Sequence, residues 1–136
     1  MSTQTIATEN KIIDDGIRPW GHYEVLSGDD HSGYKVKKIT VKPHQKLSLQ
    51  SHEFRKEIWT VIHGSGQAVK GDKMIDLKLG ETIIIELKER HRLINNTDQM
   101  LVIIEVQVGS YLGEDDIKRY SDDYGRGATF TTSPKV

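Results

Sequence analysis

Alternating hydrophobic and polar residues predict short β-strands through the centre of the chain. Residues 57–62 alternate in this way, with Trp59 and Val61 on one side of the predicted strand. β-branched and aliphatic residues dominate three further runs, at 34–41, 82–87 and 101–108. Residues that favour strands are therefore spread along most of the chain.

Glycines separate these runs. Gly64-Ser65-Gly66 and Gly71-Asp72 supply turns on either side of the short run 67–69. Short strands at close spacing, divided by glycine turns, are typical of an all-β sandwich or barrel. One helical turn is predicted late in the chain, at 114–120, where acidic residues open the segment and basic residues close it.

The length of 136 residues indicates one domain with a core of its own. Residues 1–16 are polar and weakly patterned, and we expect them to form a flexible N-terminal arm. Residues 127–136 are expected to form a C-terminal tail. The folded domain is then predicted to span residues 17–126.

The charge balance excludes several classes of function. The 19 basic and 20 acidic residues are interspersed, so the chain is not expected to bind nucleic acid. The chain has no cysteine, which excludes a disulfide scaffold and a thiolate metal site. The first residues lack the layout of a signal peptide, and no apolar run reaches transmembrane length. We therefore predict a cytoplasmic protein that does not interact with a membrane.

Four residues have the chemistry of a metal site. Gln50 and His52 are two positions apart, so both side chains point to one face of a strand. Glu57 follows after room for a turn, and His91 comes from a separate strand. Two imidazoles, a carboxylate and an amide make a mixed nitrogen and oxygen site. Such a site suits zinc, manganese, iron, cobalt or nickel, and leaves positions open for a substrate.

The spacing of these residues resembles the two sequence motifs of the cupin superfamily. Six positions fit the cupin pattern at its fixed spacing: His52, Glu57, Gly64, Gly80, His91 and Asn95. Four positions depart from it. His44 stands for a glycine and Gln50 for a histidine, while Glu86 and Lys88 replace a proline and a glycine. The resemblance implies a double-stranded antiparallel jelly-roll β-barrel of about ten strands with little helix, and a homodimer.

Longer strings narrow the resemblance. Ser48-Leu49-Gln50-Ser51-His52 and the run from Gly109 to Ile117, Gly-Ser-Tyr-Leu-Gly-Glu-Asp-Asp-Ile, are similar to the type II mannose-6-phosphate isomerase domain. That domain usually forms the C-terminal part of bifunctional mannose-1-phosphate guanylyltransferase/mannose-6-phosphate isomerases. The similarity extends over about residues 17–126. No glycine-rich nucleotide-binding loop is present, so no GTP chemistry is expected.

The resemblance implies a metal-dependent isomerase that interconverts mannose 6-phosphate and fructose 6-phosphate. Its metal ligands fall on Gln50, His52, Glu57 and His91, and zinc is the first candidate. The terminal Tyr-Gly-Arg places Arg126 at the expected active-site arginine. Two departures lie beside the ligands, namely Ile58 in place of a histidine and the segment 85–88 in place of Ile-Pro-x-Gly.

Isomerisation of a phosphorylated hexose also needs a base and cations for the phosphate. The available cations are Arg18, Lys37, Arg55, Arg92 and Arg126. For the base, proximity in sequence favours Lys46 or His44, although neither is singled out by the motif.

Two other functions remain open from the sequence. The chain could be a catalytically silent sugar-phosphate-binding cupin or a partner subunit in nucleotide-sugar metabolism. It could also keep the fold and metal but act as another sugar isomerase, an epimerase or an oxygenase. A coupled assay for fructose 6-phosphate formation separates the isomerase from the silent protein.

Overall fold

The computed structural model describes residues 14–121, which form two antiparallel sheets and contain no helix. The larger sheet has six strands in the order β1 (Ile17–Arg18), β2 (Gly21–Gly28), β3 (Tyr34–Val41), β10 (Leu101–Gly109), β5 (Arg55–His63) and β8 (Thr82–Ile85). The smaller sheet has five strands in the order β11 (Lys118–Ser121), β4 (Leu49–Ser51), β9 (His91–Ile94), β6 (Gly66–Lys70) and β7 (Lys73–Leu77).

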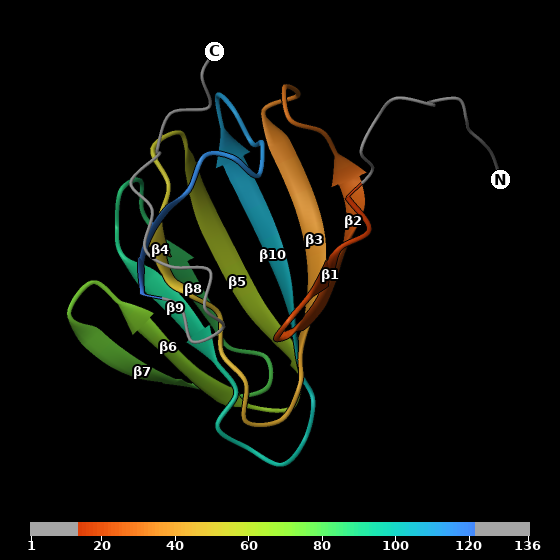
Figure 1. Ribbon diagram of the computed structural model, residues 1–136, viewed down its shortest axis with the longest axis vertical. Coiled ribbons are helices and arrows are strands. Elements are labelled where there is room, and N and C mark those ends of the chain that lie inside the picture. Colours follow the sequence, from red (N-terminus) through yellow and green to blue (C-terminus); the bar gives the residue numbers. More distant parts are fainter. Residues whose placement is uncertain (1–13, 122–136) are drawn as a thin grey trace, which may run out of the picture.

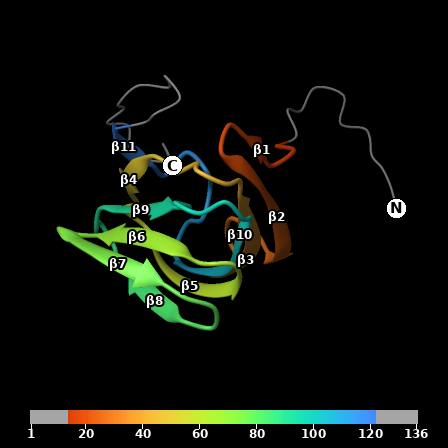
Figure 2. The same cartoon turned by 90° about the horizontal axis from the view of Figure 1, so that it is seen from below.

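The two sheets face each other as the walls of a barrel. Strands β3, β10 and β5 lie side by side in one wall, and β9, β6 and β7 form the opposite wall (Figures 1 and 2). The predicted all-β fold is confirmed, with eleven strands in the described part where about ten were expected. Since residues 14–121 have no helix, they contain no helical membrane span.

One half of the barrel interior is a hydrophobic core. Alternate residues of each strand point inward, and antiparallel pairing brings the apolar ones together. Leu101 is paired with Val41, and Ile103 lies between Ile39 and Val61. All five are 5% exposed or less. Burial of apolar surface at this end therefore stabilises the barrel.

The other half of the interior is polar. Continuing along the same three strands, the inward positions change from aliphatic to charged or amide residues. These inward polar residues are Lys35, Lys37, Arg55, Glu57, Glu105 and Gln107. Because buried charges are retained only where they are paired or functional, this half of the barrel is where a site is expected.

The helical turn predicted at 114–120 is wrong. Residues 114–115 form a turn, and β11 then pairs with β4. Pairing with the edge of the smaller sheet replaces the local helix that the charge pattern favoured. At the other end, residues 14–16 of the predicted arm contact β2, where Gly16 O accepts a 2.9 Å hydrogen bond from Tyr23 N. The rest of the arm and the tail lie outside the described residues.

Candidate metal centre

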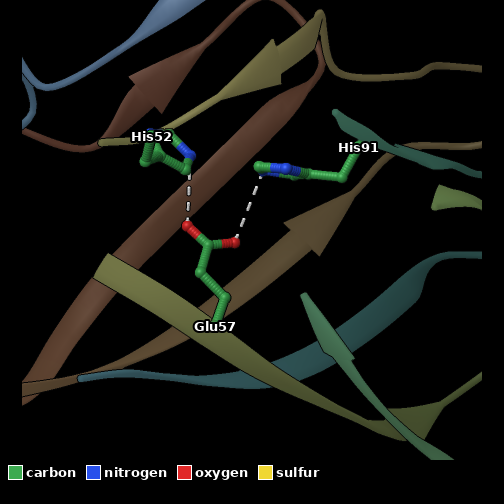
Figure 3. Close-up of side chains that lie close together, drawn as sticks. All are labelled: His52, Glu57 and His91. Atoms are coloured by element: carbon green, nitrogen blue, oxygen red, sulfur yellow. Dashed lines mark ion pairs between the residues drawn. The ribbon is translucent and has the colours of Figure 1, made fainter. Parts of the chain in front are cut away.

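Three of the four predicted metal ligands meet at one point inside the barrel. His52 follows β4, Glu57 lies on β5 and His91 begins β9. The Glu57 carboxylate points between the two imidazoles (Figure 3). His52 Nε2 is 3.2 Å from Glu57 Oε2, and His91 Nε2 is 3.7 Å from Glu57 Oε1. All three residues are buried, and one ligand atom from each lies within 4.8 Å of the others.

Backbone carbonyls orient both imidazoles. His52 Nδ1 lies 2.6 Å from Asp116 O, and His91 Nδ1 lies 2.9 Å from Glu89 O. A carbonyl oxygen only accepts, so each Nδ1 carries the proton and each Nε2 presents a lone pair toward Glu57. This is the usual outer support of a histidine metal ligand.

The environment of Glu57 keeps it ionised. Burial by itself would raise the pKa of Glu57, but the charge of the Arg55 guanidinium holds that pKa well below its usual range. Arg55 Nε donates to Glu57 Oε2 at 2.8 Å, and Trp59 Nε1 donates to Oε1 at 2.9 Å. Burial lowers the pKa of His91 to about 4, so this ring is neutral at pH 7. Both groups are therefore in the form that binds a metal.

The arrangement fits a divalent ion. Bonds of about 2.0–2.2 Å in a tetrahedral site place ligand atoms roughly 3.3–3.6 Å apart, close to the two distances found here. Gln50 is the cross-strand neighbour of His91 and lines the same cavity. Its Nε2 lies 2.9 Å from Ser48 Oγ, which leaves its carbonyl oxygen as the atom for a metal. Binding would require Arg55 Nη2, 3.2 Å from His52 Nε2, to move off that nitrogen.

Sequence comparison decides the family. The sequence model of the family "Mannose-6-phosphate isomerase C-terminal" matches residues 6–122. The chain belongs to this family. It is 49% identical over 111 residues to the alginate biosynthesis protein AlgA of Pseudomonas aeruginosa, covering 82% of this chain and 23% of that protein. It is 42% identical over 119 residues to the mannose-1-phosphate guanylyltransferase of Escherichia coli, covering 87% and 24%.

The chain therefore spans about a quarter of the length of these relatives. Structure comparison supports the fold. A double-stranded β-helix protein from Klebsiella pneumoniae has a TM-score of 0.63 at 18% identity, covering 84% of this chain and 93% of that one. A cupin-2 domain from Rhodospirillum rubrum has a TM-score of 0.59 at 15% identity, covering 67% and 61%. The jelly-roll cupin prediction is confirmed.

The backbone conformation explains why the cupin pattern has glycine at two positions where this chain departs from it. Among residues 14–121, His44 and Lys88 are the two non-glycine residues with positive φ, at 58° and 65°. Both stand where the pattern has glycine, because glycine adopts this conformation without steric cost. Ile58, which replaces a histidine of the isomerase domain, lies on the outer face of β5, opposite to its neighbour Glu57. Ile58 is therefore not directed at the metal ligands.

Four of the predicted substrate-binding cations share one cavity. Arg18, Lys37, Arg55 and Arg92 line it together with Glu57 and His91. Lys37 Nζ binds Glu114 at 2.5 Å, and Arg18 pairs with Asp14 at 2.9 Å. Arg119, which the sequence analysis passed over, also lines the cavity. The polar half of this cupin therefore presents several cations beside the candidate ligands.

The predicted catalytic residues are placed differently. Arg126 lies outside the described residues. Lys46 does not line the cavity, and its backbone forms an isolated bridge to Ile94. His44 lies at an exposed turn, 2.5 Å from Asp98. The described part of the chain therefore places neither sequence-proposed base beside the metal ligands.

Sequence reasoning missed two residues of the site. Glu105 points into the cavity from β10, and burial, followed by the charge of Glu57, raises its pKa to about 8. Asp116 is fully buried and accepts 3.0 Å hydrogen bonds from the backbone nitrogens of Glu53 and Phe54. The alternation of residues 101–108 contained a signal for Glu105, since Leu101 and Ile103 occupy the same face.

Proposed function

We propose that this protein interconverts mannose 6-phosphate and fructose 6-phosphate with a divalent metal held by Gln50, His52, Glu57 and His91. The observation that carries the proposal is the buried group of His52, Glu57 and His91 beside a cavity lined with cations. Membership of the mannose-6-phosphate isomerase C-terminal family supports this choice of substrate.

Aldose–ketose isomerisation moves a proton between C1 and C2 of the open-chain sugar through an enediol. Negative charge then develops on the oxygens of C1 and C2. A divalent ion bound at the site supplies positive charge beside these oxygens, with zinc as the first candidate and manganese, cobalt, nickel or iron as alternatives. Arg55 is buried beside Glu57 and adds a permanent positive charge on the same side.

The substrate phosphate needs cations further along the cavity. Arg18, Arg92 and Lys37 line it and come from different strands. We include Arg126 with them, because a guanidinium can contact a phosphate with two hydrogen bonds. Trp59 and Trp20 supply apolar walls against which the sugar can pack.

The test is a coupled assay for fructose 6-phosphate with zinc, manganese, cobalt, nickel or iron added to the chelator-treated protein. Metal-dependent turnover is expected. Arg126→Ala should lower kcat/KM by about 30- to 1000-fold, because loss of a charge-assisted contact costs roughly 2–4 kcal/mol. An unchanged kcat/KM would place Arg126 outside the site. No turnover with any metal would leave the silent sugar-phosphate-binding protein as the better proposal.

Two further parts of the proposal rest on sequence reasoning. We propose a cytoplasmic location, and a homodimer by resemblance to other cupins. Size-exclusion chromatography with light scattering tests the dimer.

A further inference from the structure

Glu105 lies on β10 in the polar half of the barrel. Its carboxyl group is neither a candidate metal ligand nor a contact for the substrate phosphate. The side chain is 4% exposed and lines the same cavity as Glu57 and His91. Its cross-strand neighbours are Lys37 on β3 and Trp59 on β5, so all three share the inner face of the larger sheet. The carboxyl group therefore faces the space that a substrate beside the metal ligands would occupy.

The Glu105 carboxyl group forms few polar contacts with the described part of the protein. Gln107 Nε2 donates to Glu105 Oε2 at 2.5 Å, and no other residue within 14–121 hydrogen-bonds the carboxyl. Lys37, the neighbouring cation, directs its Nζ to Glu114 instead. A buried carboxyl group without an ion-pair partner costs stability, so its retention indicates a function.

We propose that Glu105 is the acid–base residue that carries the proton between C1 and C2 of the sugar, an inference that rests on the isomerase function proposed above. In the aldose-to-ketose direction, the carboxylate takes the proton from C2. The C2–H electron pair forms the C1=C2 bond, and the π pair of the C1 carbonyl moves onto O1. The proton then returns from the Glu105 carboxyl group to C1. The C1=C2 π pair forms the new C1–H bond, the O2–H electron pair forms the C2=O2 carbonyl, and the proton released by O2 passes through solvent to O1.

The other carboxylates of the cavity are less suited to this step. Glu57 is hydrogen-bonded by Arg55 and Trp59 and faces both imidazoles. Glu114 binds Lys37 at 2.5 Å. Glu105 has one hydrogen bond on Oε2, and its Oε1 accepts none from residues 14–121. Burial also favours proton uptake by Glu105 near neutral pH, which a residue that takes and returns a proton needs.

The experiment compares the full chain with Glu105→Gln, Glu105→Asp and Glu24→Gln. Glu24 is an exposed residue on β2, and its replacement makes the same charge change outside the cavity. For each protein, kcat and KM are measured with mannose 6-phosphate and the metal that supports turnover. Exchange of the C2 hydrogen is followed by NMR in D₂O, and metal content and thermal unfolding are recorded.

Glu105→Gln should lower kcat and C2 exchange together by about 10²–10⁴-fold, with metal content unchanged and KM within a few-fold. Glu105→Asp should retain part of the activity, and Glu24→Gln all of it. If Glu105→Gln keeps its turnover and exchange, the inference is overturned while the proposed function stands. If Glu105→Gln loses metal or unfolds and Glu105→Asp is as active as the unmutated protein, the role is structural and the inference also fails. If the unmutated protein has no turnover with any metal, both the proposed function and the inference that rests on it are refuted.

Discussion

The side chain of Asp116 holds the turn that carries His52, and Asp116→Asn should therefore lower both stability and metal affinity. The two carboxylate oxygens accept 3.0 Å hydrogen bonds from the backbone nitrogens of Glu53 and Phe54, in a side chain that is 0% exposed. The backbone oxygen of the same residue lies 2.6 Å from His52 Nδ1. One residue thus supports the turn and one imidazole.

Asparagine keeps one acceptor oxygen and places an amide N–H₂ group against the second backbone N–H. One charge-assisted hydrogen bond is lost, one becomes a neutral hydrogen bond, and a buried donor is left without an acceptor. We expect the free energy of unfolding to fall by about 2–4 kcal/mol. At roughly 3 °C per kcal/mol for a domain of this size, Tm should fall by about 6–12 °C. Misplacement of His52 should weaken metal binding by about 10- to 100-fold.

Urea unfolding and calorimetry with a chelator present measure the stability change, and isothermal titration with zinc or manganese measures the affinity. Asp115→Asn is the matched control. Asp115 is the exposed neighbour and binds Tyr111 Oη through Oδ1, an acceptor that asparagine retains. It should change the unfolding free energy by less than about 0.5 kcal/mol. Equal stability of Asp116→Asn and the unmutated protein would refute the role assigned to Asp116.

Three other perturbations have defined outcomes. His91→Ala should abolish metal retention after dialysis while the barrel stays folded, as metal analysis and circular dichroism will show, with His22→Ala, at a half-buried residue away from the candidate ligands, as the control. Glu105→Gln should change the pH dependence of stability. The pKa of Glu105 is about 8 in the folded protein and near 4.5 in the unfolded chain, so the folded state binds the extra proton between these values. In urea unfolding with chelator, the unmutated protein should lose stability relative to Glu105→Gln as the pH rises from 5 to 8. Lys88→Gly should raise the unfolding free energy by about 0.5–1 kcal/mol, because the strain at a φ of 65° exceeds the added chain entropy of glycine.

Each of these three has a contrary outcome. Metal bound at one equivalent per chain in His91→Ala would remove His91 from the ligand set. A stability difference between Glu105→Gln and the unmutated protein that stays constant from pH 5 to 8 would show that Glu105 titrates as an exposed carboxyl group. A destabilised Lys88→Gly would show that the strain at a φ of 65° is smaller than the added chain entropy of glycine.

The strands and turns were predictable from local pattern because period-two alternation and glycine turns are local properties. The run 34–41 matches β3 residue for residue, and 101–108 lies within β10. The segment 114–120 was predicted wrongly because its charges favour a helix end locally, while pairing with β4 depends on residues far away in the chain. His44 and Lys88 were visible as departures, but only the backbone revealed that both positions require positive φ.

The sequence by itself determined the candidate ligand types and their spacing, since Gln50, His52, Glu57 and His91 could be named as candidate ligands from the motifs alone. The tertiary structure decided which buried charges face one another. Register between β10 and its neighbours places Glu105 beside Lys37 and in the same cavity as Glu57, and the segment after Gly113 returns Asp116 to the turn at His52. These contacts join residues more than forty positions apart, and the low-dielectric interior between the sheets is what shifts the pKa of Glu105. No local pattern encodes that burial, because it exists only after both sheets have closed around the cavity.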